Sequence, residues 1–202
     1  MPGLRELKKQ RQRQEIVAAA VALFQERGYD ETRVQDILER AEISLGTFYN
    51  YFDGKAAVLD EFAAGIIDAY ADFAQAELAA REHTVAERVR GISRACAKAF
   101  TTDPDFMTLV VTRSKAFGVS GQLPSRDIRV YGYLEELFRE GQASGEIRAD
   151  IDARELGEIY SGNFIFTAIG WLVERAERGA ADDLEPRLDR VMDVFLAGCR
   201  PQ

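Results

Sequence analysis

The sequence is poor in the residues on which disulfide and metal chemistry depend. It contains two cysteines, Cys96 and Cys199, and one histidine, His83, among 202 residues. Two cysteines so far apart do not form the dense cross-linking of small secreted domains, so we expect a reducing, cytoplasmic compartment. A single histidine leaves a zinc site almost without its usual ligands. We therefore expect neither a metal site nor a cofactor.

Long apolar runs and enzyme motifs are also missing. The longest apolar stretch, 164–173, is far shorter than the roughly 20 residues that a membrane-spanning helix needs. The charged segment 1–13 lacks the apolar centre of a signal peptide, so we expect no membrane partner. No nucleophile elbow, phosphate-binding loop or metal-ligand spacing is present, and His83 and Cys96 would lie several helical turns apart. We therefore do not expect an enzyme.

The sequence is rich in apolar residues at the helical period. Hydrophobic residues make up 47% and charged residues 30% of the chain, which is the balance of a globular protein. Ile16, Ala20, Leu23 and Phe24 recur at the spacing of one helix face, and alternating strand-like runs are nearly absent. We predict an all-α fold of about nine helices. Their expected ranges are 5–28, 33–40, 44–51, 54–82, 84–101, 104–117, 124–144, 152–178 and 184–199.

Capping and stop signals punctuate these helices. A capping box places Ser, Thr or Asp three residues before Glu or Gln. This spacing occurs at Thr32 with Gln35, Thr84 with Glu87 and Asp152 with Glu155. Asp103 precedes Pro104, which is an N-cap followed by proline at the first helical position. Asp53 can cap the helix that begins near Lys55. The expected stop signals are Gly28, Gly118, Gly145 and Gly179.

Residues 32–52 form the most informative segment. The apolar residues of its two short helices are Val34, Ile37, Leu38 and Ala41 in the first and Phe48 and Phe52 in the second. A tight turn at Glu42 and Ile43 separates the helices, and Ser44 caps the second one. Two short helices joined by a short turn, with the first packed on a longer helix, have helix-turn-helix geometry. We expect this motif to extend from about Val34 to Asp53.

The outward face of the second short helix carries small and hydrogen-bonding side chains. Such groups suit base edges and phosphates in a major groove. Ser44 and the free amides beside it can bind a phosphate, and Lys55 can reach an adjacent one. The alternatives are that the tyrosines only pack and that this two-helix turn has no DNA role. The expected DNA contacts are Thr32, Arg33, Ser44, Leu45, Gly46, Thr47, Tyr49, Asn50, Tyr51 and Lys55.

One pattern at the start of the chain combines these features. It comprises Ile16, Ala20, Leu23, Phe24, Gly28, Tyr29, Thr32, Arg33, Val34, Asp36, Ile37, Ala41 to Ser44, Gly46 to Phe52 and Lys55. Over about residues 10–70, this pattern resembles the DNA-binding region of the TetR family of bacterial transcriptional regulators. The resemblance implies a two-fold dimer, a C-terminal ligand-binding domain and release of DNA when an effector binds. It also implies that Thr47, Tyr49, Asn50 and Lys55 lie at the DNA, with Tyr49 and Lys55 mainly on phosphates.

Two positions depart from the family pattern. Glu42 stands where the family usually has a glycine in the turn. If that position needs a positive φ, either Glu42 is strained there or the turn is altered. Leu38 stands where a smaller alanine is common, which predicts looser or reshaped packing against the first helix.

The acidic net charge of −8 is unevenly distributed along the chain. The first 55 residues hold nine basic and nine acidic side chains, so the whole excess of acid lies in the remainder. The segment 1–13 carries Arg5, Lys8, Lys9, Arg11 and Arg13 against the single acid Glu6. This basic arm either contacts the DNA backbone or a minor groove, or is a solvated and frayed helix start.

The helix expected over 152–178 has two apolar faces, which predicts burial on both sides. We expect one face and the following helix to pair with their symmetry mates in a four-helix dimer interface. The alternative is an intramolecular core seam, which has the same sequence pattern. The expected dimer contacts are Ile159, Gly162, Phe166, Ile169, Val173, Leu188, Val191 and Phe195.

The other face and its neighbours are expected to line an effector site. Mostly apolar walls with a few polar groups are typical of small-molecule sites, and equally of ordinary cores. Cys96 and Cys199 leave a redox role open, although both occupy ordinary apolar positions. The ligand-binding candidates are Phe106, Val110, Arg113, Phe117, Tyr131, Leu134, Tyr160, Asn163, Phe164, Thr167 and Trp171.

These observations predict a helix-turn-helix DNA-binding domain over 1–55, extending to about 70, and a helical effector-binding and dimerisation domain over 56–202. The expected function is a homodimeric repressor that binds a near-palindromic operator in double-stranded DNA. A small, largely apolar or aromatic effector would release it. The alternative is a DNA-binding regulator without a small-molecule effector, controlled by a protein partner or constitutive.

Overall fold

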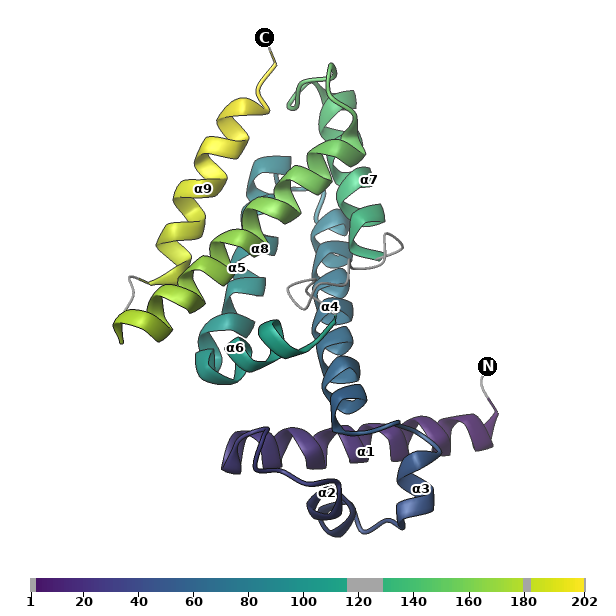
Figure 1. Cartoon of the computed structure of the whole chain (residues 1–202). Helices are drawn as coiled ribbons and strands as arrows, with labels where there is room; N and C mark the ends of the chain where they lie inside the picture. The colour runs from purple at the N-terminus through teal and green to yellow at the C-terminus, as the bar shows by residue number, and fades with distance from the viewer. Residues whose placement is uncertain (1–2, 116–128, 180–182, 202) are drawn as a thin grey trace. The chain divides into compact units, whose positions relative to one another are not determined.

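The computed structural model describes residues 3–115, 129–179 and 183–201, which form nine helices and no strand (Figure 1). The helices are α1 Leu4–Arg27, α2 Val34–Arg40, α3 Leu45–Tyr49, α4 Lys55–Ala79, α5 Val85–Thr102, α6 Pro104–Arg113, α7 Arg129–Ser144, α8 Ala153–Arg178 and α9 Leu184–Gly198. The expected all-α class is confirmed. Of the expected helical ranges, 116–117 and 124–128 lie outside the described residues, as does the stop signal at Gly118.

Local sequence signals account for several helix boundaries. The Thr84 hydroxyl accepts from the Glu87 N–H at 3.2 Å, and the Glu87 carboxylate accepts from the Thr84 N–H at 2.8 Å. The predicted capping box at the start of α5 is therefore confirmed. The Asp103 carboxylate likewise accepts from the Phe106 N–H at the start of α6. Glycines with positive φ follow three helices, at Gly28, Gly145 and Gly179.

Two predicted capping boxes are replaced by other arrangements. At α2 the carboxylate of Asp36 accepts from the Arg33 N–H at 2.8 Å. The Thr32 hydroxyl instead donates to the carbonyls of Gly28, at 2.8 Å, and Leu23, at 3.3 Å. At α8 the Asp152 carboxylate accepts from the N–H of Arg154, two residues on. Thr32 therefore closes the end of α1 rather than capping α2.

The cap position of α4 is one residue later than expected. The Gly54 carbonyl accepts from the N–H of Ala57 at 3.1 Å and from that of Val58 at 3.3 Å. Because the cap residue supplies the first carbonyl of a helix, Gly54 stands at the cap of α4. The expectation that Asp53 caps this helix is therefore corrected, since Asp53 precedes the cap position and is exposed.

The described residues form two compact units. The first comprises 3–65 and 109–115, and the second comprises 66–108, 129–179 and 183–201. Both α4 and α6 contribute residues to each unit. The sequence division at 55 assigned the last residues of α6 to the second domain, whereas they pack with the first unit.

In the first unit, α2 and α3 lie on the same side of the long helix α1 (Figure 1). The apolar face predicted for α1 is buried, and the inner faces of the short helices and the start of α4 cover it. Its core residues are Ile16, Ala20, Leu23, Phe24, Ile37, Leu38, Phe48, Phe52, Val58 and Leu59. Leu38 is buried at its expected position, so the unit accommodates the larger side chain.

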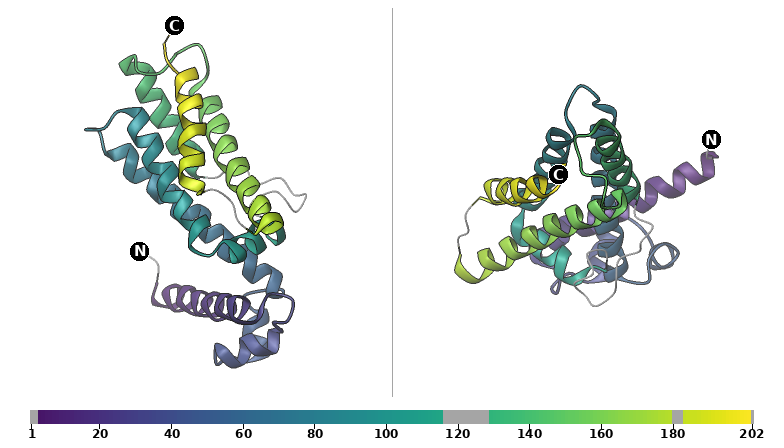
Figure 2. Two further views of the ribbon diagram at one scale, coloured as in Figure 1. Left: turned by 90° about the vertical axis from the view of Figure 1, so that its left-hand side faces the viewer. Right: turned by 90° about the horizontal axis from the view of Figure 1, so that it is seen from above.

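In the second unit, α5, α7, α8 and α9 pack side by side as a helical bundle (Figure 2). Phe138 of α7 and Phe195 of α9 meet edge to face, with ring centroids 5.8 Å apart. Gly157 lets α8 approach α7 closely, since a Cβ there would lie 3.2 Å from that of Leu134. The Glu146 carboxylate accepts from the first two amides of α5 and so ties the α7–α8 connection to it.

Within the described residues, none of the helices combines the length and the apolar character needed to cross a bilayer.

Candidate nucleic-acid interface

The turn between α2 and α3 is closed by backbone hydrogen bonds. The N–H of Ala41 donates to the carbonyl of Ile37 at 2.9 Å, and that of Ile43 donates to Leu38 at 3.1 Å. Between them Glu42 has φ +52°, in the left-handed region that favours glycine. The strain expected at Glu42 is therefore present, and the turn keeps its geometry. A non-glycine residue there costs about 1 kcal/mol.

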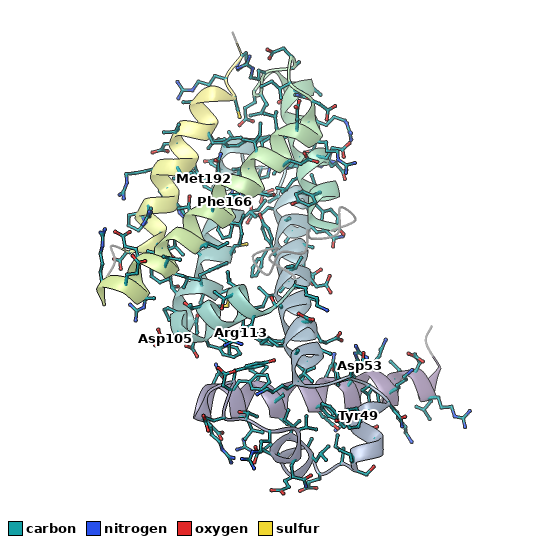
Figure 3. The ribbon with its side chains drawn as sticks, in the orientation of Figure 1. Tyr49, Asp53, Asp105, Arg113, Phe166 and Met192 are labelled. Atoms are coloured by element: carbon teal, nitrogen blue, oxygen red, sulfur yellow. The ribbon has the colours of Figure 1, made fainter. Side chains whose placement is uncertain are left out.

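The helices of the motif occupy a shorter range than the expected span from Val34 to Asp53. Its start is as expected, because α2 begins at Val34. Its end is corrected, because α3 ends at Tyr49 and Asp53 lies in the connection to α4 (Figure 3). Phe52, between them, is buried in the core of the unit. Asp53 therefore belongs to the segment that leads into α4.

The short helix α3 is anchored on one side and open on the other. Phe48 is fully buried, and the Ser44 hydroxyl accepts from the Thr47 N–H at 3.1 Å. Ser44 and Thr47 also share a hydrogen bond between their hydroxyls at 2.8 Å. Tyr49 is half exposed, with 53% of its surface accessible (Figure 3). Arg33, Ser44, Leu45, Gly46 and Asn50 are also exposed, and Thr47 is half-buried. The expected DNA contacts on α3 and at its two ends are thus accessible to solvent, in full or in part.

Tyr51 belongs to the packing of the unit. Its side chain is half-buried, and its hydroxyl donates to the Gln12 side chain of α1 at 2.8 Å. This contact matches the packing alternative for one of the two tyrosines. Tyr51 positions α3 against α1, whereas Tyr49 lies outward.

Lys55 and Thr32 hold the connection between α1 and α2. The Lys55 ammonium donates to the carbonyls of Tyr29, Asp30 and Thr32 at 2.6, 3.2 and 3.0 Å. It also lies 4.4 Å from the centre of the Tyr29 ring, which is a cation–π contact. All three ammonium donors are therefore occupied within the protein. A phosphate contact by Lys55 would require at least one of these hydrogen bonds to be released.

The expected phosphate contact of Thr32 is corrected by the structure. Its side chain is 1% exposed, and its hydroxyl is already donated to backbone carbonyls. Its N–H donates to the Tyr29 carbonyl. Thr32 therefore has no accessible donor for DNA, because backbone carbonyls at and just after the end of α1 accept from both its hydroxyl and its N–H.

Arg13 joins α1 to α4 and to the segment that follows α3. Its guanidinium donates two hydrogen bonds to the Glu61 carboxylate, at 2.6 and 2.9 Å, and one to the Tyr51 carbonyl at 3.4 Å. It also lies 4.6 Å from the centre of the Phe52 ring. The hydrogen bonds from Arg13 lower the pKa of Glu61. Sequence reasoning placed Arg13 in the basic arm and missed Glu61, because 48 positions separate the partners.

The rest of the basic arm is available to solvent. Arg5, Lys8 and Lys9 are exposed on α1. Arg11 pairs with Glu15 one turn along the helix, and both side chains are more than half exposed. Such an exposed pair contributes little to stability. The arm therefore keeps its positive charge accessible, apart from Arg13.

The end of α6 lies in the first unit and contacts the α1–α2 connection. Arg113 pairs with Asp30 at 3.2 Å and lies 5.8 Å from the centre of the Tyr29 ring. The N–H of Lys115 donates to the Asp60 carboxylate at 2.9 Å. Arg113, expected to orient an effector in the C-terminal domain, therefore lies in the first unit and pairs with Asp30 there. Val110, another expected effector contact, is buried in that unit too.

The remaining effector candidates lie in the second unit, with one exception outside the described residues, Phe117. Phe106, Leu134, Tyr160, Phe164 and Trp171 are buried there, and Tyr131, Asn163 and Thr167 are half-buried. The Thr167 hydroxyl donates to the Asn163 carbonyl at 2.6 Å, within α8. Phe164 stacks against Tyr70 of α4 and meets Phe100 of α5 edge to face, at 6.1 and 5.8 Å between ring centres.

Polar side chains lie within this apolar interior. The hydroxyls of Ser93 and Tyr160 share a hydrogen bond at 3.0 Å, and Tyr160 donates to the Val89 carbonyl at 3.4 Å. The hydroxyl of Tyr70 is buried as well. Sequence reasoning missed Tyr70 and Ser93, because nothing in the helical pattern marks them as buried polar groups.

The cysteines do not have the setting of redox sensors. Cys96 and Cys199 are both buried and free, and burial raises the pKa of each thiol. A protonated, buried thiol is a poor nucleophile. No cluster of three or more His, Cys, Asp or Glu side chains able to hold a metal ion occurs in the residues described.

The two faces expected at the dimer interface differ in how far they are exposed. On α8, Ile159, Phe166 and Val173 are 45%, 77% and 48% exposed, with Gly162 and Ile169 half-buried between them. Figure 3 labels Phe166, the most exposed of them. On α9, Leu188 and Phe195 are buried in the core of their own unit, so their expected dimer contact is corrected. Val191 is half-buried, and Val194, which sequence reasoning missed, is 76% exposed.

Several known proteins are similar to this chain. The model of the family described as bacterial regulatory proteins, tetR family, matches residues 16–62. The regulator TcmR of Streptomyces glaucescens is 29% identical, over 100% of this chain and 88% of its own. The repressor KstR of Mycobacterium tuberculosis is 25% identical, over 91% of this chain and 80% of its own.

A solved structure shares the fold over almost the whole chain. The crystal structure of FadR from Thermus thermophilus, a TetR-family repressor in complex with lauroyl-CoA, matches with a TM-score of 0.67 at 22% identity. The match covers 92% of this chain and 94% of FadR. Residues 16–62 therefore carry the DNA-binding region of the TetR family of bacterial regulatory proteins, and the chain is similar over nearly its whole length to transcriptional regulators and repressors rather than to enzymes.

Proposed function

We propose that the protein is a homodimeric repressor that leaves a near-palindromic operator when a small, largely apolar effector binds its second unit. The observation that carries the proposal is the exposed face of α3, which a buried Phe48 and a closed turn hold in place. A rigid short helix with an accessible polar face is what major-groove reading requires.

In this proposal α3 reads base edges and its neighbours bind phosphates. Thr47, Tyr49 and Asn50 supply the hydroxyl and amide groups that pair with bases or the backbone. Ser44 contacts Thr47, Arg33 is exposed at the start of α2, and both side chains suit phosphate oxygens. The exposed arm residues Arg5, Lys8 and Lys9 add sequence-independent attraction to the backbone. Binding to chromosomal DNA places the protein in the cytoplasm.

The exposed apolar face of α8 supports a two-fold dimer. Ile159, Phe166 and Val173 form a row along one side of a helix whose other side is buried. Such a row is costly in water and suits a second copy of itself across a two-fold axis. On α9, Val191 and Val194 continue the apolar surface in place of Leu188 and Phe195. Two copies of α8 and α9 would give a four-helix interface.

The interior of the second unit supports an effector with an apolar or aromatic body. Phe100, Phe164 and Tyr70 gather three rings from three helices within it. The structurally similar FadR of Thermus thermophilus binds lauroyl-CoA, a ligand with a long apolar chain. Both observations favour a ligand held mainly by apolar contact.

Footprinting of the full chain on the intergenic DNA beside its own gene tests the proposal. We expect a protected near-palindromic site at physiological salt, and selection from random DNA should recover two inverted half-sites. Asn50→Ala should change the selected sequence, whereas Asn163→Ala, the same change on α8, should leave it unchanged. Absence of a protected site with both methods, or a selected sequence that Asn50→Ala leaves intact, contradicts the proposal.

Native mass spectrometry of the purified protein tests the other two parts. We expect the mass of two chains, and any retained effector adds its own mass. A monomer at micromolar concentration contradicts the dimer. An operator complex that no small molecule releases contradicts effector control and supports regulation by a protein partner or constitutive binding.

A further inference from the structure

The interior of the second unit contains a polar group whose hydrogen bond is missing. The hydroxyl of Tyr70 on α4 is buried and has no partner within hydrogen-bonding distance among the described residues, although the Tyr160 hydroxyl lies near enough to affect its pKa. Close to it, the hydroxyls of Ser93 and Tyr160 satisfy one another, and Tyr160 also donates to the Val89 carbonyl. A buried hydroxyl without a partner is unfavourable and calls for an explanation, such as a bound molecule.

The surroundings of the Tyr70 hydroxyl are aromatic. The Tyr70 ring stacks on Phe164 with an angle of 30° between the planes, and Phe164 meets Phe100 edge to face. The hydroxyl therefore stands at the end of an apolar aromatic surface built from α4, α5 and α8. An apolar ligand body that contacts these rings would bring one polar group within reach of this donor.

The electrostatic environment restricts which polar group fits. Burial raises the pKa of Tyr70, and the groups that affect it further are Tyr160, Cys96 and Tyr131. All of them are neutral near pH 7, because burial also raises their pKa values. An ionised ligand group here would lose its hydration without gaining an opposite charge. A neutral acceptor of one hydrogen bond meets no such penalty.

We propose that the Tyr70 hydroxyl donates a hydrogen bond to a neutral carbonyl oxygen of the effector, whose apolar body contacts Phe164 and Phe100. The proposal rests on effector binding by the second unit, as proposed above, and deepens it by naming the chemical class. Ketones, esters and thioesters belong to this class, whereas free carboxylates and plain hydrocarbons do not. The hydroxyls of Ser93 and Tyr160 already donate within the protein, so neither is expected to donate to the ligand.

Three small aromatic probes of matched size test this assignment in the full-length protein. Acetophenone carries a neutral carbonyl, ethylbenzene replaces it with a methylene group, and benzoate carries a negative charge. Titrations followed by two-dimensional NMR give their dissociation constants. We expect acetophenone to bind about tenfold more tightly than ethylbenzene, as one hydrogen bond allows, and benzoate to bind most weakly.

Removal of the donor isolates its contribution. Tyr70→Phe should bind acetophenone and ethylbenzene equally, with ethylbenzene affinity unchanged within about twofold. Tyr133→Phe removes a phenol from a half-buried position on α7 in the same unit and should keep the wild-type preference. In the ligand-free protein, Tyr70→Phe should leave the Tm unchanged or raise it, because the hydroxyl it removes is unsatisfied.

Several results overturn the assignment. They are equal affinities for acetophenone and ethylbenzene in the wild type, a preference that survives Tyr70→Phe, no binding of any probe, or a lowered Tm of the ligand-free variant. Operator protection by the same preparation separates this failure from failure of the proposed function. If the chain protects no DNA, the repressor proposal fails. If it protects DNA but shows no carbonyl preference through Tyr70, only this inference fails.

Discussion

The role of Lys55 can be tested by replacing it with methionine, which keeps the length of the side chain and removes the charge. The wild-type ammonium donates to three carbonyls at 2.6, 3.0 and 3.2 Å and contacts the Tyr29 ring. Because Lys55 is half-buried, each of these hydrogen bonds is worth about 1 kcal/mol rather than its fully buried value. Lys55→Met should therefore lower the free energy of unfolding by about 3 kcal/mol.

Urea denaturation followed by circular dichroism measures this loss. Lys9→Met is the matched control, because Lys9 is exposed on α1 and its removal should change stability by less than about 0.5 kcal/mol. Equal stabilities of the Lys55→Met variant and the wild type would refute the structural role that the three carbonyl contacts assign to Lys55.

Binding at different salt concentrations then separates structure from phosphate contact. If Lys55 only holds the α1–α2 connection, Lys55→Met weakens operator binding while the dependence of log K on log salt keeps its slope. If Lys55 bound a phosphate in each half-site, a dimer would lose two contacts and the slope would shrink by about 2. A shrunken slope together with unchanged stability would show that the carbonyl contacts are exchanged for DNA.

Three further predictions concern the turn, the dimer face and acid stability. Glu42→Gly should raise the free energy of unfolding by about 1 kcal/mol in urea denaturation, because glycine adopts φ +52° without strain; a destabilised variant contradicts the strain argument. Phe166→Glu places a charge on a side chain that is 77% exposed. It should leave the helical circular dichroism unchanged and shift sedimentation from dimer to monomer, and a persisting dimer would exclude this face. Since Arg13 lowers the pKa of Glu61 in the folded state, their pairing stabilises above about pH 4.3 and is lost as the pH falls through the lowered pKa. Glu61→Gln should therefore flatten the fall in stability with acid, measured by urea denaturation from about pH 6 to pH 3, and an unchanged slope would contradict this.

Local features of the fold and the site could be predicted from the sequence. Helical periodicity and caps such as Thr84 with Glu87 act over three or four residues, so the pattern itself contains both partners. The strain at Glu42 was expected from the family resemblance, because Glu42 stands where the family usually has a glycine, and the residue has φ +52°. The outward position of Tyr49 and the burial of Phe48 follow from the helical period of α3.

The sequence by itself determined the helices, the helix-turn-helix and which side of α3 is exposed, because these depend on neighbours within a turn or two. The tertiary structure alone decided which charges are free and which apolar face of a helix is open. Lys55 and Arg13 look available for DNA until the chain brings carbonyls and Glu61 to them from distant positions. Leu188 and Phe195 share the spacing of an interface, yet the rotation of α9 about its axis turns them into the core and leaves Val194 outside. Packing against other helices sets that rotation, so the periodicity within a single helix cannot predict it.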